Sequence, residues 1–235
     1  MEKVNIKIVL ILLFSSLVLI FSCKKDYYED GGTHSPVYNG TILDFLKSRP
    51  ELFTKVVKVV ELSGYSALLD DNKANITFFA PADESINKTI KNLNRSLFVL
   101  GRDTVKNLEQ IPAETWRKFL GRYIYEGKSL LKDYPHLDTN DIIAAPGQYY
   151  ISHGGEIMNI GVFKNDVVTK NSAGDEQVAK YAGYRQLIIG MRNPVATSDL
   201  QPTNGVVHVL NFSRHSFGFF PFEFINEVIT KGIND

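Results

Sequence analysis

Two segments of the chain place apolar residues at the three- and four-residue spacing of an amphipathic helix. The first begins at Pro50 and stops at Gly64, and its apolar face consists of Leu52, Phe53, Val56, Val57 and Val60. The second begins at Pro112 and stops at Gly127, with a face of Trp116, Phe119, Leu120, Tyr123 and Ile124. Proline at the start of a helix and glycine after its end support both boundaries. The pattern predicts two helices that each bury one side.

Shorter elements accompany these helices. Thr41 and Asp44 have the spacing of a helix-capping pair and predict a short helix over residues 41–47. Residues 65–69 look like one further helical turn. Residues 75–81 form a β-prone run that ends at Pro81, because proline cannot donate to a sheet ladder.

After residue 134 the pattern changes to short apolar runs separated by turn residues. We expect these runs to be β-strands, and they cover residues 149–151, 157–160, 166–168, 186–189 and 205–210. Helices followed by strands are typical of an α+β fold, whereas a Rossmann fold alternates the two. The pattern therefore predicts α+β architecture, with helices packed against a largely antiparallel sheet.

The amino-terminal end has the pattern of an export signal. Lys3 and Lys7 precede a largely apolar run over residues 8–21, which ends at a small residue. This order of basic, apolar and small residues predicts a secretory signal peptide over residues 1–22. The run is about fourteen residues long, whereas roughly twenty span a bilayer, which disfavours the alternative of a transmembrane anchor.

Cys23 is the only cysteine in the chain, so an internal disulfide framework and a multi-cysteine metal site are excluded. Residues 20–23, Ile-Phe-Ser-Cys, resemble the lipobox of bacterial lipoproteins, although Phe21 stands where a smaller residue is usual. The resemblance implies a lipid on Cys23, with residues 23–38 as a tether to the membrane; a free thiol is the alternative. Lys24 replaces the aspartate that retains lipoproteins in the inner membrane, which implies the outer membrane. Acidic residues behind it resemble a surface-export signal.

The composition is that of an ordinary globular protein. Hydrophobic residues make up 44% of the chain and charged residues 22%, which is typical of a folded domain. The 26 Lys and Arg residues balance the 26 Asp and Glu residues. Because the chain has neither a net positive field nor a basic run, we expect no nucleic-acid partner.

Two segments at opposite ends of the predicted domain resemble the conserved boxes of the fasciclin (FAS1) domain family. Residues 77–86 read Thr-Phe-Phe-Ala-Pro-Ala-Asp-Glu-Ser-Ile, and residues 204–211 read Asn-Gly-Val-Val-His-Val-Leu-Asn. The resemblance implies one fasciclin domain over residues 39–213. It also assigns structural motif positions to Phe79, Ala80, Pro81, Asp83, Asn204, Gly205, His208 and Asn211.

The second box carries two structural expectations. Asn204 and Gly205 are expected to form a turn in which the glycine takes a positive φ. His208 lies in an apolar strand, so we expect a hydrogen-bonded structural histidine and not a ligand or a base. The middle motif of the family, usually Tyr-His, appears here as residues 122–125, Arg-Tyr-Ile-Tyr. Without that histidine, the integrin contact of some animal members cannot be transferred.

The sequence lacks the motifs of nucleotide-binding, zinc-protease and serine-hydrolase sites. Its five histidines have no helical i, i+4 pair, and we expect no cofactor, no metal and no catalysis. A carbohydrate-active or other hydrolytic envelope enzyme is the alternative. It would use carboxylates such as Glu114, Glu126 or Asp133, which are more simply explained as surface charges.

Residues 214–235 form an aromatic C-terminal extension in which Gly218 and Pro221 are expected to interrupt any regular element. Its rings either pack back on the domain, which we favour, or form a partner-binding surface of Phe217, Phe219, Phe220 and Phe222.

We expect a non-catalytic binding or adhesion module that serves a surface nutrient-capture or envelope complex. Its partner would be an envelope protein or a glycan.

Overall fold

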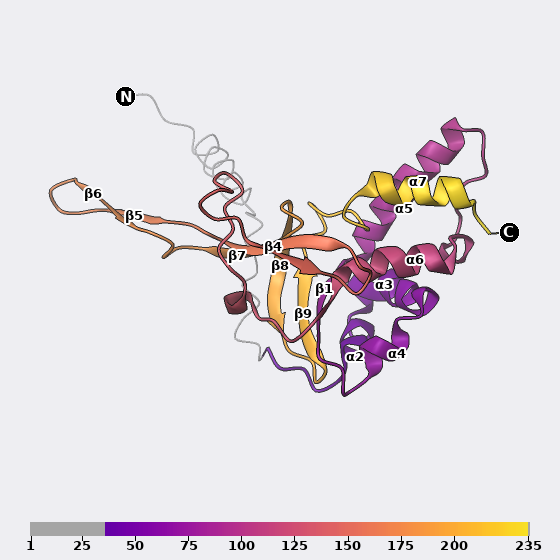
Figure 1. Ribbon diagram of the computed structural model, residues 1–235, viewed down its shortest axis with the longest axis horizontal. Coiled ribbons are helices and arrows are strands. Elements are labelled where there is room, and N and C mark those ends of the chain that lie inside the picture. Colours follow the sequence, from indigo (N-terminus) through magenta and orange to yellow (C-terminus); the bar gives the residue numbers. More distant parts are fainter. Residues whose placement is uncertain (1–35, 235) are drawn as a thin grey trace, which may run out of the picture. The chain divides into compact units, whose positions relative to one another are not determined.

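A seven-stranded sheet forms the centre of the fold (Figure 1). The computed structural model describes residues 36–234. The strand order is β2-β1-β9-β8-β7-β4-β3, with bounds β1 Ile76–Ala80, β2 Ile124–Glu126, β3 Gln148–Ile151, β4 Ile157–Lys164, β7 Arg185–Ile189, β8 Asn193–Leu200 and β9 Gly205–Leu210. Strands β1 and β9 pair in parallel, and the other neighbours in this sheet pair antiparallel.

Six α-helices, three short 3-10 helices and a β-ribbon accompany the sheet in the part of the chain that the structure describes. The α-helices are α2 Ile42–Lys47, α3 Pro50–Ser63, α4 Ser66–Asp70, α5 Asp83–Val99, α6 Ala113–Leu120 and α7 Pro221–Lys231. Figure 1 shows them gathered to one side of the sheet, while the ribbon of β5 Val167–Lys170 and β6 Glu176–Ala179 extends away from the other side. The predicted α+β class with a largely antiparallel sheet is confirmed.

The boundaries of α2 and α3 follow from their sequence signals. Thr41 Oγ1 accepts a hydrogen bond from the Asp44 N–H at 3.1 Å, and Asp44 Oδ2 accepts one from the Thr41 N–H at 3.0 Å, which is the predicted capping box. Gly64 ends α3 in the left-handed conformation. The buried face of α3 consists of Phe53, Val56, Val59, Val60 and Ser63. The predicted face was therefore wrong at Leu52, which is exposed, whereas Val57 is partly buried and packs against the core.

The predicted helix from Pro112 to Gly127 was wrong in its second half. Helix α6 ends at Leu120, residues 121–123 form a 3-10 turn, and Ile124 begins strand β2. Position 121 has no room for a side chain, because a Cβ there would lie 2.8 Å from the Gly154 Cα. All five predicted apolar positions are buried, because the turn and the strand face the same core as the helix.

The C-terminal segment contains a helix that the sequence analysis missed. Pro221 does not interrupt this segment; it occupies the first turn of α7, where proline is favoured. Phe217, Phe219, Phe224 and Val228 belong to the same hydrophobic core as the sheet and helices. Strands β2, β6 and β8 were also missed.

The core of the described domain lies entirely between residues 36 and 234, which form one compact unit. Within this range no helix is both long and apolar enough to cross a bilayer. The predicted signal peptide, Cys23 and most of the tether lie outside the described residues.

Candidate binding groove

The two motif boxes meet at the centre of the sheet. Strand β1 of the first box pairs in parallel with β9 of the second, and this register places Phe79 opposite His208. The Phe79 ring also packs against Tyr125 and Tyr134, with centroids at 5.6 and 6.2 Å. Ala80 and Pro81 are buried at the end of the strand. The boxes therefore form the interior of the domain.

Asn204 and Gly205 hold the helical layer against the sheet. The buried Asn204 side chain accepts a hydrogen bond from the Ile42 N–H at 2.8 Å and donates one to the Leu69 carbonyl at 2.9 Å. Gly205 does not have the predicted positive φ. A Cβ at Gly205 would lie 2.3 Å from the Ile76 carbonyl oxygen, so glycine is required for space and not for backbone conformation.

The His208 side chain is fully buried, and both of its ring nitrogens make hydrogen bonds. Its Nδ1 accepts a hydrogen bond from the Asp199 N–H at 3.2 Å, so its Nε2 carries the proton and donates to the Ser129 carbonyl at 2.9 Å. Burial lowers the pKa of His208 to about 4. The Asp199 carboxylate, 3.9 Å from Nδ1 and partly exposed, is too weak to compensate. The ring is neutral at neutral pH and inaccessible to a ligand.

The remaining motif residues also make local structural contacts. Asp83 Oδ1 accepts hydrogen bonds from the backbone N–H groups of Lys55 at 2.8 Å and Val56 at 3.0 Å, which holds the start of α5 against α3. Asn211 Oδ1 accepts from the Ser213 N–H at 3.0 Å in the turn after β9. These positions hold elements together, and the accessible surface lies elsewhere.

The phenylalanine-rich segment divides into a buried and an exposed part. Phe217 packs between Trp116 and Tyr123, with centroids at 5.4 and 5.5 Å, and Phe219 stacks on Tyr123 at 4.5 Å. Phe217 and Phe219 are therefore core residues and do not belong to an exposed partner surface, because their rings are covered. Phe220 and Phe222 remain exposed, Phe222 to 73%.

The exposed rings line a groove of about 760 Å³, which we name the aromatic groove. One wall is formed by Tyr149 and Ile157 of the β3–β4 hairpin, whose side chains are largely exposed. The other wall is formed by residues 220–222, and Met191, Arg192 and Arg214 also line the groove. Large apolar side chains next to arginines are typical of surfaces that bind a partner.

Two residues that line the groove have a left-handed backbone. Met191 has φ 63° and Phe219 has φ 64°, and neither is a glycine. Non-glycine residues adopt this conformation uncommonly. Tyr181 and Asp199, which do not line the groove, adopt it too, so this backbone conformation does not by itself distinguish the aromatic groove.

A buried hydrogen-bond chain fixes the loops beneath the groove. His215 Nδ1 donates to Asn193 Oδ1 at 2.9 Å, and the Tyr123 hydroxyl donates to His215 Nε2 at 2.8 Å. The Gly218 N–H donates to the same hydroxyl at 2.6 Å. Asn193 donates through its amide to the Ile189 carbonyl, which sets the direction of the chain. Burial, followed by the Lys88 charge, lowers the pKa of His215 to about 3, so the ring is neutral.

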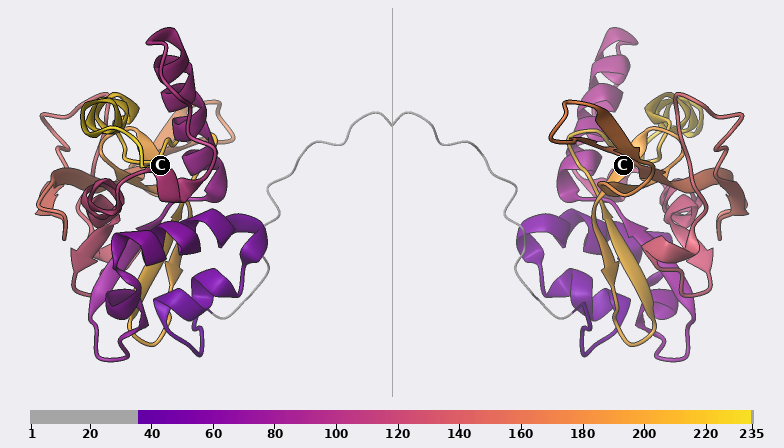
Figure 2. Two further views of the ribbon diagram at one scale, coloured as in Figure 1. Left: turned by 90° about the vertical axis from the view of Figure 1, so that its right-hand side faces the viewer. Right: turned by 90° about the vertical axis from the view of Figure 1, so that its left-hand side faces the viewer.

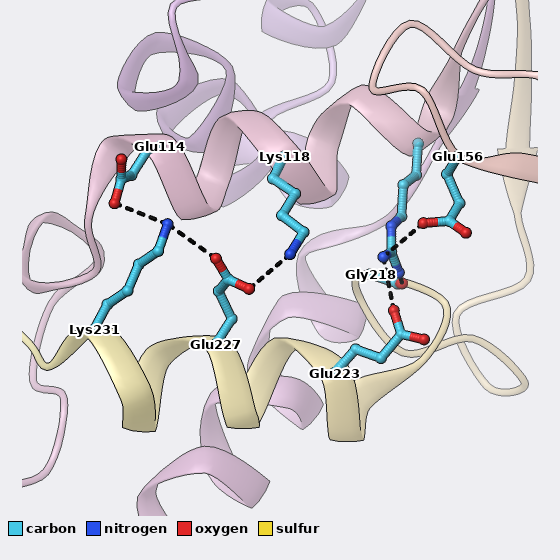
Figure 3. Close-up of polar contacts among 8 residues, drawn as sticks. Glu114, Lys118, Glu156, Gly218, Glu223, Glu227 and Lys231 are labelled. Atoms are coloured by element: carbon cyan, nitrogen blue, oxygen red, sulfur yellow. Dashed lines mark hydrogen bonds and ion pairs between the residues drawn. The ribbon is translucent and has the colours of Figure 1, made fainter.

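Arg122 connects the two walls of the groove. Its buried guanidinium pairs with Glu156 at 2.9 Å in the β3–β4 hairpin and with Glu223 at 2.7 Å in α7. It also donates to the Gly218 carbonyl at 3.0 Å and lies over the Phe119 ring at 4.5 Å. Figure 3 shows the Glu156 and Glu223 carboxylates directed toward the same point beside Gly218. The hairpin and the C-terminal helix are thus held by one cation.

A second set of ion pairs fastens α7 to α6. Glu227 accepts from Lys118 at 2.6 Å and from Lys231 at 2.9 Å, and Lys231 also pairs with Glu114 at 2.8 Å (Figure 3). The hydrogen bond from Lys118 holds the pKa of the Glu227 carboxyl below its ordinary value. Together with the buried Phe224 and Val228, this network fixes the helix that follows the groove.

A sequence model of the fasciclin domain matches residues 51–212, which is more than half of the chain. The chain belongs to the fasciclin family. The resemblance seen in the two sequence boxes is confirmed, and domains of this family are adhesion-type modules, generally without enzymatic activity.

One similar solved structure is a FAS1 domain pair from the insect cell adhesion molecule fasciclin I. It is 19% identical and has a TM-score of 0.46, and the match covers 73% of the present chain. The chain spans about half the length of that structure, with 49% of it covered. No curated protein matches the chain.

The carboxylates considered for a hydrolase do not form a site in this fasciclin domain. Glu114 pairs with Lys231, and Asp133 Oδ2 caps a turn by accepting from the Leu130 N–H at 2.8 Å. Glu126 is exposed at the end of β2. Neither the aromatic groove nor the other large groove is lined by any of the three. Across residues 36–234 no group of three or more His, Cys, Asp or Glu residues could hold a metal ion.

Only one wall of the aromatic groove could be predicted from the sequence. Phe220 and Phe222 were predicted as part of a possible partner surface, whereas Tyr149, Ile157 and Arg122 were given no binding role. Strand β3 offered a signal, because Tyr149, Tyr150 and Ile151 are all large and apolar with no polar alternation. Arg122 gave none, since its partners lie 34 and 101 residues away along the chain.

Proposed function

We propose that this fasciclin domain is the binding module of a membrane-anchored, surface-exposed lipoprotein, and that it recognises an envelope protein through the aromatic groove without catalysing a reaction. The observation that carries the proposal is a groove of about 760 Å³ lined by two exposed rings, Phe220 and Phe222, together with the exposed side chains of Tyr149 and Ile157. Rings exposed in this way bury large apolar area when a partner covers them.

The chemistry of the groove favours a protein partner over a glycan. Aromatic residues, methionine and arginine are enriched at protein interfaces, and the groove contains all three classes. Tyr149 and Phe222 are the expected hot spots because they are large, exposed and backed by ordered structure. The Arg122 ion pairs and the buried hydrogen-bond chain keep both walls in place before binding, which reduces the ordering cost.

Membrane attachment rests on the amino-terminal sequence. A short apolar run followed by Ser22 and Cys23 supports export and lipidation, and two or more acyl chains give firm anchoring. The absence of aspartate after the cysteine supports the outer membrane as the destination, where an accessory role in a nutrient-capture or envelope complex fits a tethered binding module.

The binding claim is tested by recovery of partners from envelope extracts. Residues 36–235 would be immobilised as the parent and as Tyr149→Ala, Phe222→Ala and the control Ile143→Ala, whose side chain is 94% exposed elsewhere. We expect each groove variant to lose roughly 2 kcal/mol of binding free energy, about thirtyfold in Kd. The control should bind like the parent. Equal recovery by all four proteins would contradict the proposal.

The class of partner is tested on the same extracts. Protease treatment should abolish recovery if the partner is a protein. Recovery that survives protease but is lost after glycosidase treatment would replace the protein partner with a glycan and retain the groove as the site.

The anchor is tested separately in cells. Cys23→Ser should abolish fatty-acid labelling and release or mislocalise the protein, because the thiolate is the acylated group. Normal labelling and membrane retention of this variant would refute the lipoprotein assignment and leave the binding claim untouched.

A further inference from the structure

The C-terminal end of α5 exposes three consecutive large apolar residues. Phe98 is 77% exposed, Val99 78% and Leu100 54%. Figure 2 shows this end of the helix projecting beyond the other helices of the domain. We call residues 98–100 the apolar tip.

The fold does not need these side chains to end the helix. Gly101 adopts φ 66°, and the Arg102 N–H donates to the Leu97 carbonyl at 2.9 Å, which closes the helix through backbone groups. Leu93 and Leu97 already supply the buried contacts of this last part of α5. Three adjacent exposed apolar residues are unfavourable in water unless they serve a function.

Basic residues lie on both sides of the apolar tip in the chain, and one of them, Arg102, donates to the Ile229 carbonyl of α7 at 2.6 Å. Residues 91–106 contain Lys91, Arg95, Arg102 and Lys106, and Asp103 is the single acidic residue among them. This imbalance stands out in a chain whose total charge is zero. Lys91 and Lys106 have no ion-pair partner among residues 36–234.

We infer that the apolar tip docks into an anionic phospholipid surface. The apolar tip enters the boundary between head groups and acyl chains. The exposed basic residues Lys91, Arg95 and Lys106 contact the anionic head groups. A fluid bilayer suits this shape because it closes around a convex projection, whereas a protein partner would need a matching cavity. The inference goes beyond the binding function above, since it uses neither Cys23 nor the aromatic groove.

Vesicle co-sedimentation tests the inference. Residues 36–235 hold the complete core of the domain, so this fragment would be mixed with vesicles of phosphatidylcholine, either alone or blended with phosphatidylglycerol. We expect clear binding to the anionic vesicles, weak binding to the neutral ones, and a loss of binding with added salt.

Matched variants separate the two contributions. Phe98→Ser with Leu100→Ser should weaken partitioning by about tenfold or more, because two large apolar side chains no longer enter the interface. Arg95→Glu should weaken it by at least about fivefold, since each basic residue near an anionic surface contributes about 1 kcal/mol. The controls Ile143→Ser and Lys73→Glu alter exposed residues elsewhere and should bind like the parent. Unchanged melting midpoints would show that all variants are folded.

Three outcomes would overturn the inference. The first is a parent domain that does not bind anionic vesicles. The second is a folded Phe98→Ser, Leu100→Ser variant that binds as well as the parent. The third is a parent domain that self-associates in sedimentation while the tip variant stays monomeric and vesicle binding is absent, which would assign the apolar tip to a second copy of the chain.

Discussion

Replacing Gly205 tests the difference between a glycine required for space and one required for backbone conformation. A Cβ at this position would lie 2.3 Å from the Ile76 carbonyl oxygen and 2.7 Å from the Ile42 Cδ1. The first neighbour is backbone in the paired strand β1, so it cannot rotate away. Gly205→Ala must therefore push two central strands apart.

The cost follows from the size of that displacement. Overpacking a core costs about 1 to 3 kcal/mol, and we expect about 2 to 3 kcal/mol here because backbone must move. For a domain of this size about 1 kcal/mol lowers the melting midpoint by about 2 to 4 °C, so we expect a drop of roughly 4 to 12 °C. Gly205→Asn should cost more than Gly205→Ala, because its side chain is larger.

Thermal and denaturant unfolding of residues 36–235 measures this order. Gly155 is the matched control, since it has φ 81° and nothing within 4 Å of an added Cβ. At Gly155 asparagine should be tolerated better than alanine, because asparagine adopts the left-handed conformation more readily. If Gly205→Asn proved more stable than Gly205→Ala, the steric explanation would be wrong and the glycine would be serving a positive φ.

Three further outcomes are expected. Because burial lowers the pKa values of His208 and His215, the unfolded chain binds more protons than the native state below about pH 6.5. The free energy of unfolding should therefore be highest above that pH and fall by up to about 1.4 kcal/mol per pH unit per histidine as the pH drops toward 4. Denaturant midpoints that do not change with pH would contradict this. Phe217→Ala should cost about 3 to 5 kcal/mol of unfolding free energy and Phe222→Ala less than about 0.5, and equal midpoints would show that the buried and exposed rings were misassigned. Arg122→Met should lower the free energy of unfolding by about 1 to 3 kcal/mol and should also reduce partner recovery, because both walls of the groove lose their shared cation. Unchanged recovery would show that the ion pairs do not position the walls.

Local signals were sufficient where an element is determined by its own residues. The Thr41 capping box, the Gly64 stop and the strand ending at Pro81 all lie where the sequence places them. Each depends on a hydrogen bond or a backbone conformation within a few residues. The same holds for the fold class, because helical and alternating periods are themselves local.

Prediction failed where distant contacts decide the structure. The helical spacing through Ile124 continued the period of α6, but pairing between Phe78 and Ile124 draws the chain into strand β2. Strand β8 was missed because Pro194 and its polar residues argue against a strand, although Val195 pairs with Leu210. Pro221 was interpreted as a helix breaker because its position in the first turn of α7 could not be seen from composition.

The candidate site was predictable only in part for the same reason. A cluster of phenylalanines indicates either a core or a surface, and the choice depends on which rings the rest of the domain covers. Phe217, Phe219 and Phe224 are buried, whereas Phe220 and Phe222 are exposed. The opposite wall comes from Tyr149 and Ile157, which precede Phe220 and Phe222 by about 60 to 75 positions in the chain. A single sequence does not show that such segments meet.

Site-specific photo-cross-linking in living cells tests the central claim most directly. A photoreactive phenylalanine analogue at position 222 of the full-length chain, in place of Phe222, should form a covalent adduct with an envelope protein. The same analogue in place of Ile143, which is exposed on another part of the surface, should not. Equal adducts from both positions, or none from position 222 while position 143 reacts, would show that the aromatic groove is not the binding surface.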